Sequence, residues 1–239
     1  MAIIEVDKLQ KRYGDRVAVA DVSFAVEPGE IFGIIGPNGA GKTTTVECVS
    51  GLRRPDGGTV AVAGYDPRRS RGEVRRRLGV QLQSSELQDK LKVREALDLY
   101  ASFYEDPAEP AELMRELGLT DHAGAPYAKL SGGLKQRLSI ALALIGKPSV
   151  AILDEVTTGL DPHARRETWR IIEGLRDRGV TIVLVTHYMD EAERLCDRIA
   201  VIDAGRAVAI NTPGGLVDAT GAGTLEDAFV ALTSAGRTS

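Results

Sequence analysis

The chain has 239 residues, of which 43% are hydrophobic and 27% are charged, the composition of a globular protein with a large buried core. Its formal net charge of −4 argues against a general polyanion-binding surface, so we expect no nucleic-acid partner. No apolar run approaches the roughly 20 residues of a bilayer-spanning helix, and the start of the chain lacks the pattern of a secretory signal.

The N-terminal part of the chain is expected to form a small β layer in front of a glycine-rich loop. Short apolar stretches between turn residues predict strands at residues 3–6, 17–26, 31–35 and 59–63. A helix is expected at residues 43–50 and ends at Gly51. The arginine-rich stretch 67–79 is interpreted as a solvated helix face, with a contact to lipid headgroups as the alternative.

The rest of the chain changes pattern at about residue 146. Before it, helical spacing of leucines, alanines and charged residues predicts a helical insertion with helices at 93–103, 110–117 and 134–145. After it, apolar strands at 150–153, 180–185 and 199–202 alternate with helices at 162–178 and 189–197. This alternation implies βαβ units. A last amphipathic helix is expected at 225–232.

Residues 36–43 carry the strongest signal in the sequence. They match the pattern G-x-x-x-x-G-K-[ST] at every fixed position, after an apolar strand and before a helix. The glycines let consecutive N–H groups face one phosphate, and the helix adds its positive N-terminal end. Lys42 is expected to reach the β- and γ-phosphates of a nucleotide, and the hydroxyl of Thr43 is expected to bind Mg²⁺.

A second element ends in two carboxylates. The apolar residues 150–153 lead directly into Asp154 and Glu155. Beside a phosphate loop, Asp154 is expected to hold Mg²⁺ and Glu155 to accept a proton from an attacking water. Without that loop, the same pattern indicates an ordinary strand end with solvated acids.

A third element, Ser131-Gly132-Gly133, opens a helix and offers another anion site. Alone, this pattern is typical of an ordinary N-cap. Because the same chain also holds the phosphate loop, we interpret the two elements as halves of sites that two copies share.

Together these elements resemble the ATP-binding subunit of an ABC transporter, and the resemblance covers nearly the whole chain. Seven motifs carry it in the family's order: Tyr13 of the A-loop; Gly36, Pro37, Asn38, Gly39, Ala40, Gly41, Lys42, Thr43 and Thr44 of Walker A; Gln83 of the Q-loop; Ser131, Gly132 and Gly133 of the signature; residues 152–155 of Walker B; Asp161 of the D-loop; His187 of the switch. Gln81 competes with Gln83 for its assignment. Asp161 has a second interpretation as the cap of the helix at 162.

The resemblance implies an ATP hydrolase that uses ATP and Mg²⁺. The catalytic residues would be Lys42, Gln83, Glu155 and His187; Mg²⁺ would be held by Thr43, Gln83 and Asp154. Tyr13 would stack on the adenine, with a plain surface aromatic as the alternative.

Two residues depart from the family's pattern, because Leu134 replaces a glutamine and Val156 a proline, but neither change removes a catalytic group.

The implied fold is an α/β P-loop NTPase with a RecA-like core, an antiparallel β subdomain and a helical subdomain. A single ABC ATPase domain would span residues 1–239: residues 1–83 and 147–215 form the core with its β layer, 84–146 the helical subdomain and 216–239 a C-terminal extension. Two ATPase subunits, identical or different, would dimerise head to tail. A separate integral membrane permease would dock near Gln83 and residues 84–91. We therefore expect a cytoplasmic protein held at the inner face of the cell membrane, consistent with two cysteines that form no C-x-x-C pair.

The export branch of the family is favoured over import. Residues 80–85, 186–193 and 225–229 resemble drug and antibiotic exporters of the daunorubicin-resistance type, which implies export of a drug-like, hydrophobic or amphipathic substrate. The alternatives are a soluble ABC-type ATPase that acts on nucleic acid or ribosomes, and a P-loop kinase or GTPase. The acidic charge and the single copy of each motif argue against the first, and the signature, D-loop and switch residues argue against the second.

Overall fold

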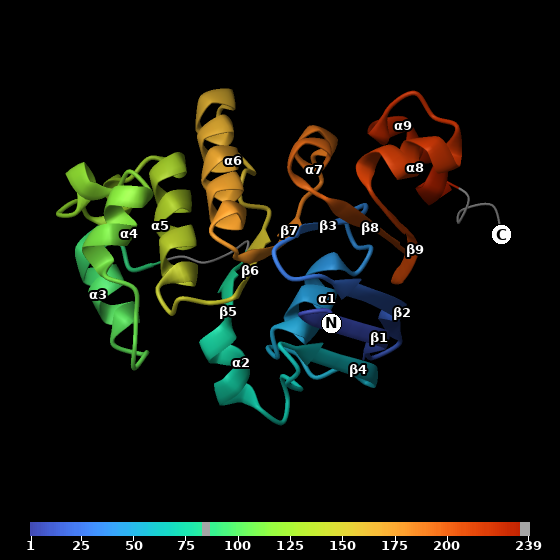
Figure 1. The fold of residues 1–239 in the computed structure, drawn as a ribbon, viewed down its shortest axis with the longest axis horizontal. Helices are drawn as coiled ribbons and strands as arrows, with labels where there is room; N and C mark the ends of the chain where they lie inside the picture. Colours follow the sequence, from blue (N-terminus) through green and yellow to red (C-terminus); the bar gives the residue numbers. More distant parts are fainter. Residues whose placement is uncertain (83–86, 235–239) are drawn as a thin grey trace.

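The computed structural model describes residues 1–82 and 87–234 (Figure 1). Gln83 and residues 84–86 of the expected docking segment lie outside the described residues. The described residues form a nine-stranded sheet in the order β4-β1-β2-β9-β8-β3-β7-β6-β5. Its strands are β1 (Ile4–Tyr13), β2 (Arg16–Val26), β3 (Ile31–Ile35), β4 (Gly57–Val62), β5 (Leu78–Gln81), β6 (Val150–Asp154), β7 (Thr181–Val185), β8 (Arg198–Asp203) and β9 (Arg206–Asn211).

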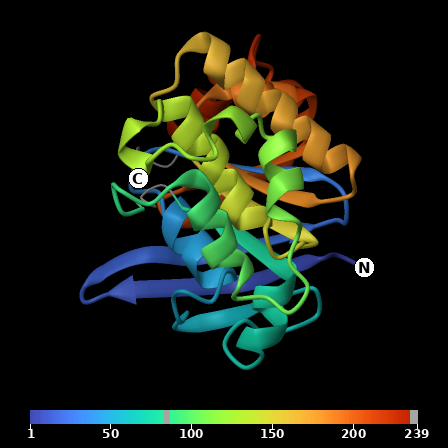
Figure 2. The ribbon, with the colours of Figure 1, turned by 90° about the vertical axis from the view of Figure 1, so that its left-hand side faces the viewer.

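Helices pack on both sides of the central strands (Figure 1). They are α1 (Lys42–Val49), α2 (Arg71–Arg77), α3 (Val93–Ala101), α4 (Pro110–Glu116), α5 (Gly132–Leu144), α6 (Pro162–Asp177), α7 (Met189–Leu195), α8 (Pro213–Thr220) and α9 (Leu225–Ser234), with short 3₁₀ turns at Thr120–His122 and Tyr127–Lys129. Helices α3, α4 and α5 gather at one end of the molecule and face the viewer in Figure 2. None of the helices in the described part of the chain combines the length and apolar composition that crossing a bilayer requires.

Strands β8, β3, β7, β6 and β5 run parallel to one another, while β9 pairs antiparallel with β8. Alternate side chains of a strand point to opposite faces, and each face of this sheet is covered. Ile31 and Ile35 of β3 therefore join the core beneath the helices α3 to α9, while Phe32 and Ile34 join the core that contains α1 and the hairpin β1–β2. This arrangement explains why β3, β6 and β7 are continuous apolar runs in the sequence.

The N-terminal β layer is antiparallel. Strand β1 pairs with β2 and with β4, and Tyr13 lies opposite Arg16 across the tight turn between β1 and β2. The layer joins the parallel sheet through a short contact in which Asp21 of β2 pairs with Arg206 of β9. The hairpin thus places the end of β1 beside the loop that follows β3.

The structure agrees with the expected α/β P-loop fold and adds elements that the sequence pattern did not indicate. Strands β5 and β9 and helix α8 were not expected, and β1 is longer than the predicted strand at 3–6. Residues 87–146 contain helices and turns but no strand of the sheet, while the division of the chain into subdomains stays a prediction.

Candidate functional site

The loop between β3 and α1 forms a tight cradle. Two of its glycines have no room for a side chain: a Cβ at Gly36 would lie 2.1 Å from the carbonyl oxygen of Ile202, and one at Gly41 would lie 2.4 Å from that of Ala18. Gly41 also adopts φ 103°, a conformation that residues with a side chain rarely adopt. At these two positions the loop therefore has a backbone geometry that only glycine permits.

Lys42 begins α1 and closes the cradle. Its Nζ donates hydrogen bonds to the carbonyl oxygens of Gly36 (2.8 Å) and Pro37 (3.1 Å), so the ammonium lies across the loop. The side chain is 6% exposed, and this burial lowers the pKa of Lys42, an effect that the nearby carboxylates of Glu155 and Asp154 oppose. The chain thus holds a buried, preorganised cation where phosphate would lie.

A cavity of about 810 Å³ opens over this loop. It brings together most of the residues that the sequence analysis assigned to one nucleotide site: Tyr13, Gly36, Pro37, Asn38, Gly39, Gly41, Lys42, Thr43, Thr44, Glu155 and His187. Ala40 does not line the cavity; it is buried beneath the loop, and its carbonyl accepts a hydrogen bond from Gly205. Tyr13 is 40% exposed at the rim, where Lys11 and Arg53 contact its ring.

Two catalytic candidates meet because their strands are neighbours. Asp154, the last residue of β6, pairs with Val185, the last residue of β7, so the residues that follow both strands emerge side by side. Glu155 and His187 follow these ends, and Oε1 of Glu155 lies 3.3 Å from Nδ1 of His187. Glu155 has φ 52°, the left-handed region, and its N–H donates to the carbonyl of Val185 (2.9 Å). Such strained backbone in a non-glycine residue is concentrated at functional sites.

Asp154 is suited to hold a cation. It is 1% exposed, and its Oδ2 has no hydrogen-bond partner among the described residues. Burial, together with the nearby carboxylate of Glu155, raises the pKa of Asp154 to about 6, against the opposing effect of Lys42. A buried carboxylate oxygen without a donor, near Lys42 of the phosphate loop, matches the few protein ligands that Mg²⁺ takes in nucleotide sites.

Gln81, the competitor of Gln83, has a structural role. It is 4% exposed, its Oε1 accepts a hydrogen bond from the N–H of Asp154 (3.1 Å), and its Nε2 donates to the carbonyl of Leu82. The side chain therefore links β5 to β6 beneath the site. The assignment of Gln83 stays a prediction, because that residue lies outside the described part of the chain.

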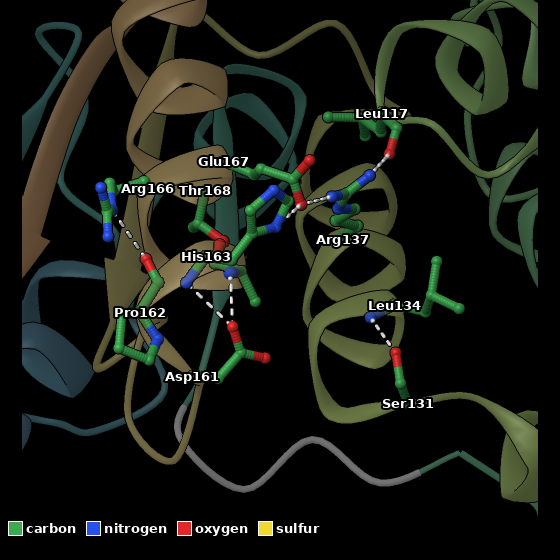
Figure 3. Close-up of polar contacts among 11 residues, drawn as sticks. Leu117, Ser131, Leu134, Arg137, Asp161, Pro162, His163, Arg166, Glu167 and Thr168 are labelled. Atoms are coloured by element: carbon green, nitrogen blue, oxygen red, sulfur yellow. Dashed lines mark hydrogen bonds and ion pairs between the residues drawn. The ribbon is translucent and has the colours of Figure 1, made fainter.

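The signature and D-loop residues line a second, separate cavity of about 370 Å³ (Figure 3). Ser131 caps α5, since its Oγ accepts a hydrogen bond from the N–H of Leu134 (3.3 Å), and Gly132 and Gly133 form the first turn. Asp161 caps α6 by accepting from the N–H groups of His163 (2.9 Å) and Ala164 (3.0 Å), which holds the pKa of Asp161 below its usual value. Both expected cap interactions are thus present.

An ion pair joins the two helices of this second cavity. Arg137 of α5 contacts the carboxylate of Glu167 on α6 and also donates to the carbonyl of Leu117, and His163 lies 3.4 Å from the same carboxylate (Figure 3). The two departures from the family's pattern cause no disruption: Leu134 packs against the hydrophobic core and Val156 is fully buried in it.

The structure also places residues in the first cavity that sequence reasoning missed. Arg16 and Ala18 come from the hairpin strand opposite Tyr13, and Phe229 comes from α9. Arg16 and Ala18 lie only a few residues from Tyr13 in the chain, which offered a weak signal for both. No local pattern pointed to Phe229, because its position depends on how the C-terminal helices pack.

Comparisons with known proteins place these observations in a family. The model of the family described as "ABC transporter" matches residues 19–158. The chain is 43% identical over 224 residues to the "Nod factor export ATP-binding protein I" of Burkholderia orbicola (strain AU 1054), covering 91% of this chain and 73% of that protein.

Two solved structures have the same fold as this chain. One, described as the structure of an ATP binding subunit of an ABC transporter, has a TM-score of 0.87 and 31% sequence identity, and covers 96% of this chain and 99% of that one. Another, cbiO1 from Clostridium perfringens, described as part of the ABC transporter complex cbiONQ, has a TM-score of 0.80 and 26% identity over 91% of each chain.

Proposed function

The chain belongs to the ABC transporter family as an ATP-binding subunit, and from that premise we propose that it powers the export of a hydrophobic or amphipathic substrate through a separate membrane permease. As a member of this family it is an ATPase coupled to transport. One observation carries the proposal beyond the family: the relatives that match over about nine tenths of the chain are named as export ATP-binding proteins. These relatives do not favour the competing assignment, an ATPase that acts on nucleic acid or ribosomes.

The proposed catalytic cycle assigns a task to each group in the first cavity. The N–H groups of residues 36–44 and the ammonium of Lys42 bind the phosphates, and Tyr13 stacks on the adenine. Glu155 accepts the proton of the attacking water at its carboxylate, and His187, within hydrogen-bond reach of Glu155, orients that carboxylate and contacts the γ-phosphate. Thr43, Asp154 and Gln83 hold Mg²⁺, which when bound neutralises charge on the β- and γ-phosphates.

The two cavities give the reason for proposing a dimer. Within one chain, Ser131 and Asp161 line a different cavity from Lys42 and Glu155. A head-to-tail dimer with an identical or a second ATPase subunit brings the signature of one copy to the phosphate loop of the other. ATP would close this dimer and hydrolysis would reopen it, and a permease would convert the movement into transport at the inner face of the membrane.

Transport in inside-out membrane vesicles tests the proposal. The chain is expressed together with a permease encoded in a neighbouring reading frame, and ATP-dependent uptake of an amphipathic fluorescent dye is measured. Uptake into inside-out vesicles corresponds to export. We expect uptake with the wild type, none with Glu155→Gln, and sedimentation of both proteins with the membranes. Permease alone is the control.

Two outcomes contradict the proposal. If ATP drives dye out of the inside-out vesicles, the direction is import. If the protein stays in the supernatant with every neighbouring permease and instead co-purifies with ribosomes or DNA, transport is the wrong assignment.

A further inference from the structure

Glu191 is a fully buried carboxylate to which the proposed cycle gives no task. It lies on α7 with 0% of its surface exposed. Its Oε1 accepts two hydrogen bonds, from the hydroxyl of Thr157 and from the indole Nε1–H of Trp169, both at 2.8 Å. Its Oε2 is buried and has no hydrogen-bond partner among the described residues. Burying an ionisable group costs free energy unless its hydrogen bonds compensate. Glu191 therefore depends on its two donors, Thr157 and Trp169, to stay buried.

The two donors and Glu191 itself come from three segments, each of which carries a residue of the proposed site. Thr157 follows Glu155 on the loop after β6, and Trp169 lies on α6, whose N-cap is Asp161. Glu191 lies on α7, which begins just after His187. One carboxylate oxygen therefore connects the Walker B loop, the D-loop helix and the switch helix.

The hydrogen bonds of Glu191 stabilise a loop whose backbone has an unfavourable conformation. Glu155 holds the left-handed conformation, φ 52°, which is unfavourable for a residue with a side chain. Its N–H is fixed to Val185, and its carboxylate lies 3.3 Å from His187. The hydrogen bond from the hydroxyl of Thr157 to Glu191 holds the same loop two residues further along the chain. The loop that carries Glu155 is thus held by two sets of contacts, one to Val185 and His187 and the other to Glu191. All three of these residues belong to the segment that continues from β7 into α7.

The third partner, Trp169, is itself held in place. The guanidinium groups of Arg165 and Arg194 contact its ring at 5.3 and 5.1 Å from the centroid. Arg165 also pairs with Asp190 (3.1 Å) on α7, and Arg194 pairs with Glu173 (3.1 Å) on α6. These contacts join α6 to α7 and keep the indole N–H directed at Glu191.

We propose that Glu191 is a positioning residue for ATP hydrolysis: it holds the loop of Glu155, the helix that Asp161 caps and the switch segment of His187 in one fixed arrangement. This inference rests on the proposed roles of Glu155 and His187. It places the effect in the chemical step, because Glu191 lines neither cavity, and within the described residues its side chain bonds to Thr157 and Trp169, which lie outside the phosphate loop.

The test removes one or both of these hydrogen bonds and includes matched controls. Thr157→Val removes one donor, and Glu191→Met removes the shared acceptor at similar volume. Glu191→Gln keeps an acceptor oxygen and is the conservative variant. Thr168→Val makes the same chemical change at a buried threonine of α6 whose hydroxyl, among the described residues, donates its hydrogen bond to the carbonyl of Ala164 on the same helix.

We expect kcat to fall about 10- to 100-fold in Thr157→Val and Glu191→Met, since a small misplacement of a catalytic group has effects of this size. The Kd for a fluorescent ATP analogue should stay within about threefold of wild type, because the phosphate loop is untouched. Glu191→Gln should recover most of kcat, and Thr168→Val should resemble the wild type.

Trp169 provides a readout that does not depend on turnover. It is the only tryptophan in the sequence, so its emission reports on this network alone. ATP should shift the emission of the wild type and of Thr168→Val. It should not shift the emission of Thr157→Val, in which Trp169 is intact but the loop is no longer tied to Glu191.

A purely structural role would lower the midpoint of urea unfolding while leaving kcat and the emission shift unchanged, and that result overturns the proposal. So does a kcat in Thr157→Val no lower than in Thr168→Val. If Glu191→Met does not fold, Thr157→Val and Glu191→Gln decide. Glu155→Gln is measured in parallel: if it hydrolyses ATP normally, the proposed site has failed, whereas its loss of activity beside an active Thr157→Val rejects only the role of Glu191.

Discussion

At the scale of single residues, the site depends on positions where the backbone has an unfavourable conformation or leaves no room for a side chain. Glu155 adopts φ 52° at the end of β6, and this conformation turns its carboxylate away from the strand direction toward His187. Gly36 and Gly41 pack so closely against carbonyl oxygens of Ile202 and Ala18 that alanine would clash at either position. Such geometry is retained only when the surroundings determine it, here through the pairing of β6 with β7 and of β3 with β8.

Replacing Glu155 by glutamine tests the proposed general base. The amide keeps the size of the side chain but cannot accept the proton of the attacking water, so kcat should fall by about 10²–10⁴. Binding of a fluorescent ATP analogue should persist, and an ATP-bound dimer should accumulate in size-exclusion chromatography. Glu226→Gln, which changes an exposed carboxylate of α9, is the control. Turnover of Glu155→Gln within a few-fold of wild type would remove Glu155 from this role.

Residues whose chemistry is local could be predicted from the sequence. The phosphate loop, Asp154 and Glu155 were found because a strand, its terminal residues and the following turn are contiguous in the chain. Glu191 could not be found in this way. Its function depends on hydrogen bonds to Thr157 and Trp169, which are distant in sequence, and a glutamate on a short polar helix normally indicates a solvated surface.

At the scale of elements, the buried strands and the long amphipathic α6 match their predicted positions closely, because apolar runs and helical periodicity are strong signals. Strand β9 was missed because its side chains are half exposed and its pattern is weak. Helix α8 was missed because Pro213-Gly214-Gly215 reads as a turn. Pro213 in fact occupies the first helical turn, and Thr212 caps the helix by accepting a hydrogen bond from the N–H of Gly215 (3.0 Å).

The packing of α9 leads to a prediction about Phe229. This side chain lines the first cavity, where we propose that ATP binds, although it comes from the end of the described chain. Phe229→Ala should weaken binding of a fluorescent ATP analogue about 2- to 10-fold, since an aromatic contact contributes about 0.5–1.5 kcal/mol. KM for ATP should rise with little change in kcat. Val230→Ala alters the next residue of α9, which is 54% exposed and lies outside the cavity, and should bind like the wild type. Equal affinity in both variants would show that α9 does not contribute to the site.

At the scale of the whole molecule, the residues that we propose as the two halves of a phosphate site lie apart within one chain. Lys42 and Glu155 line one cavity, and Ser131 and Asp161 line the other. The ion pair between Arg137 and Glu167 ties the signature helix α5 to α6, so Ser131 and Asp161 face the second cavity together. The sequence analysis already interpreted the two elements as halves of sites that two copies share. The distance between them within one chain could not be predicted, because it depends on how α3–α5 pack against the core.

This separation predicts complementation between two inactive variants. Lys42→Ala breaks the phosphate loop and Ser131→Arg blocks the signature, so each homodimer should be inactive. In a heterodimer, the intact loop of one copy meets the intact signature of the other, which restores one of the two sites. Random mixing should therefore recover roughly a quarter of wild-type ATPase activity if the sites fire independently. A disulfide between Ser131→Cys and Asn38→Cys, formed only with ATP, is the second measurement, and the native cysteines will not interfere because both are buried. Neither recovery nor cross-link would mean that each chain hydrolyses ATP without its partner's signature.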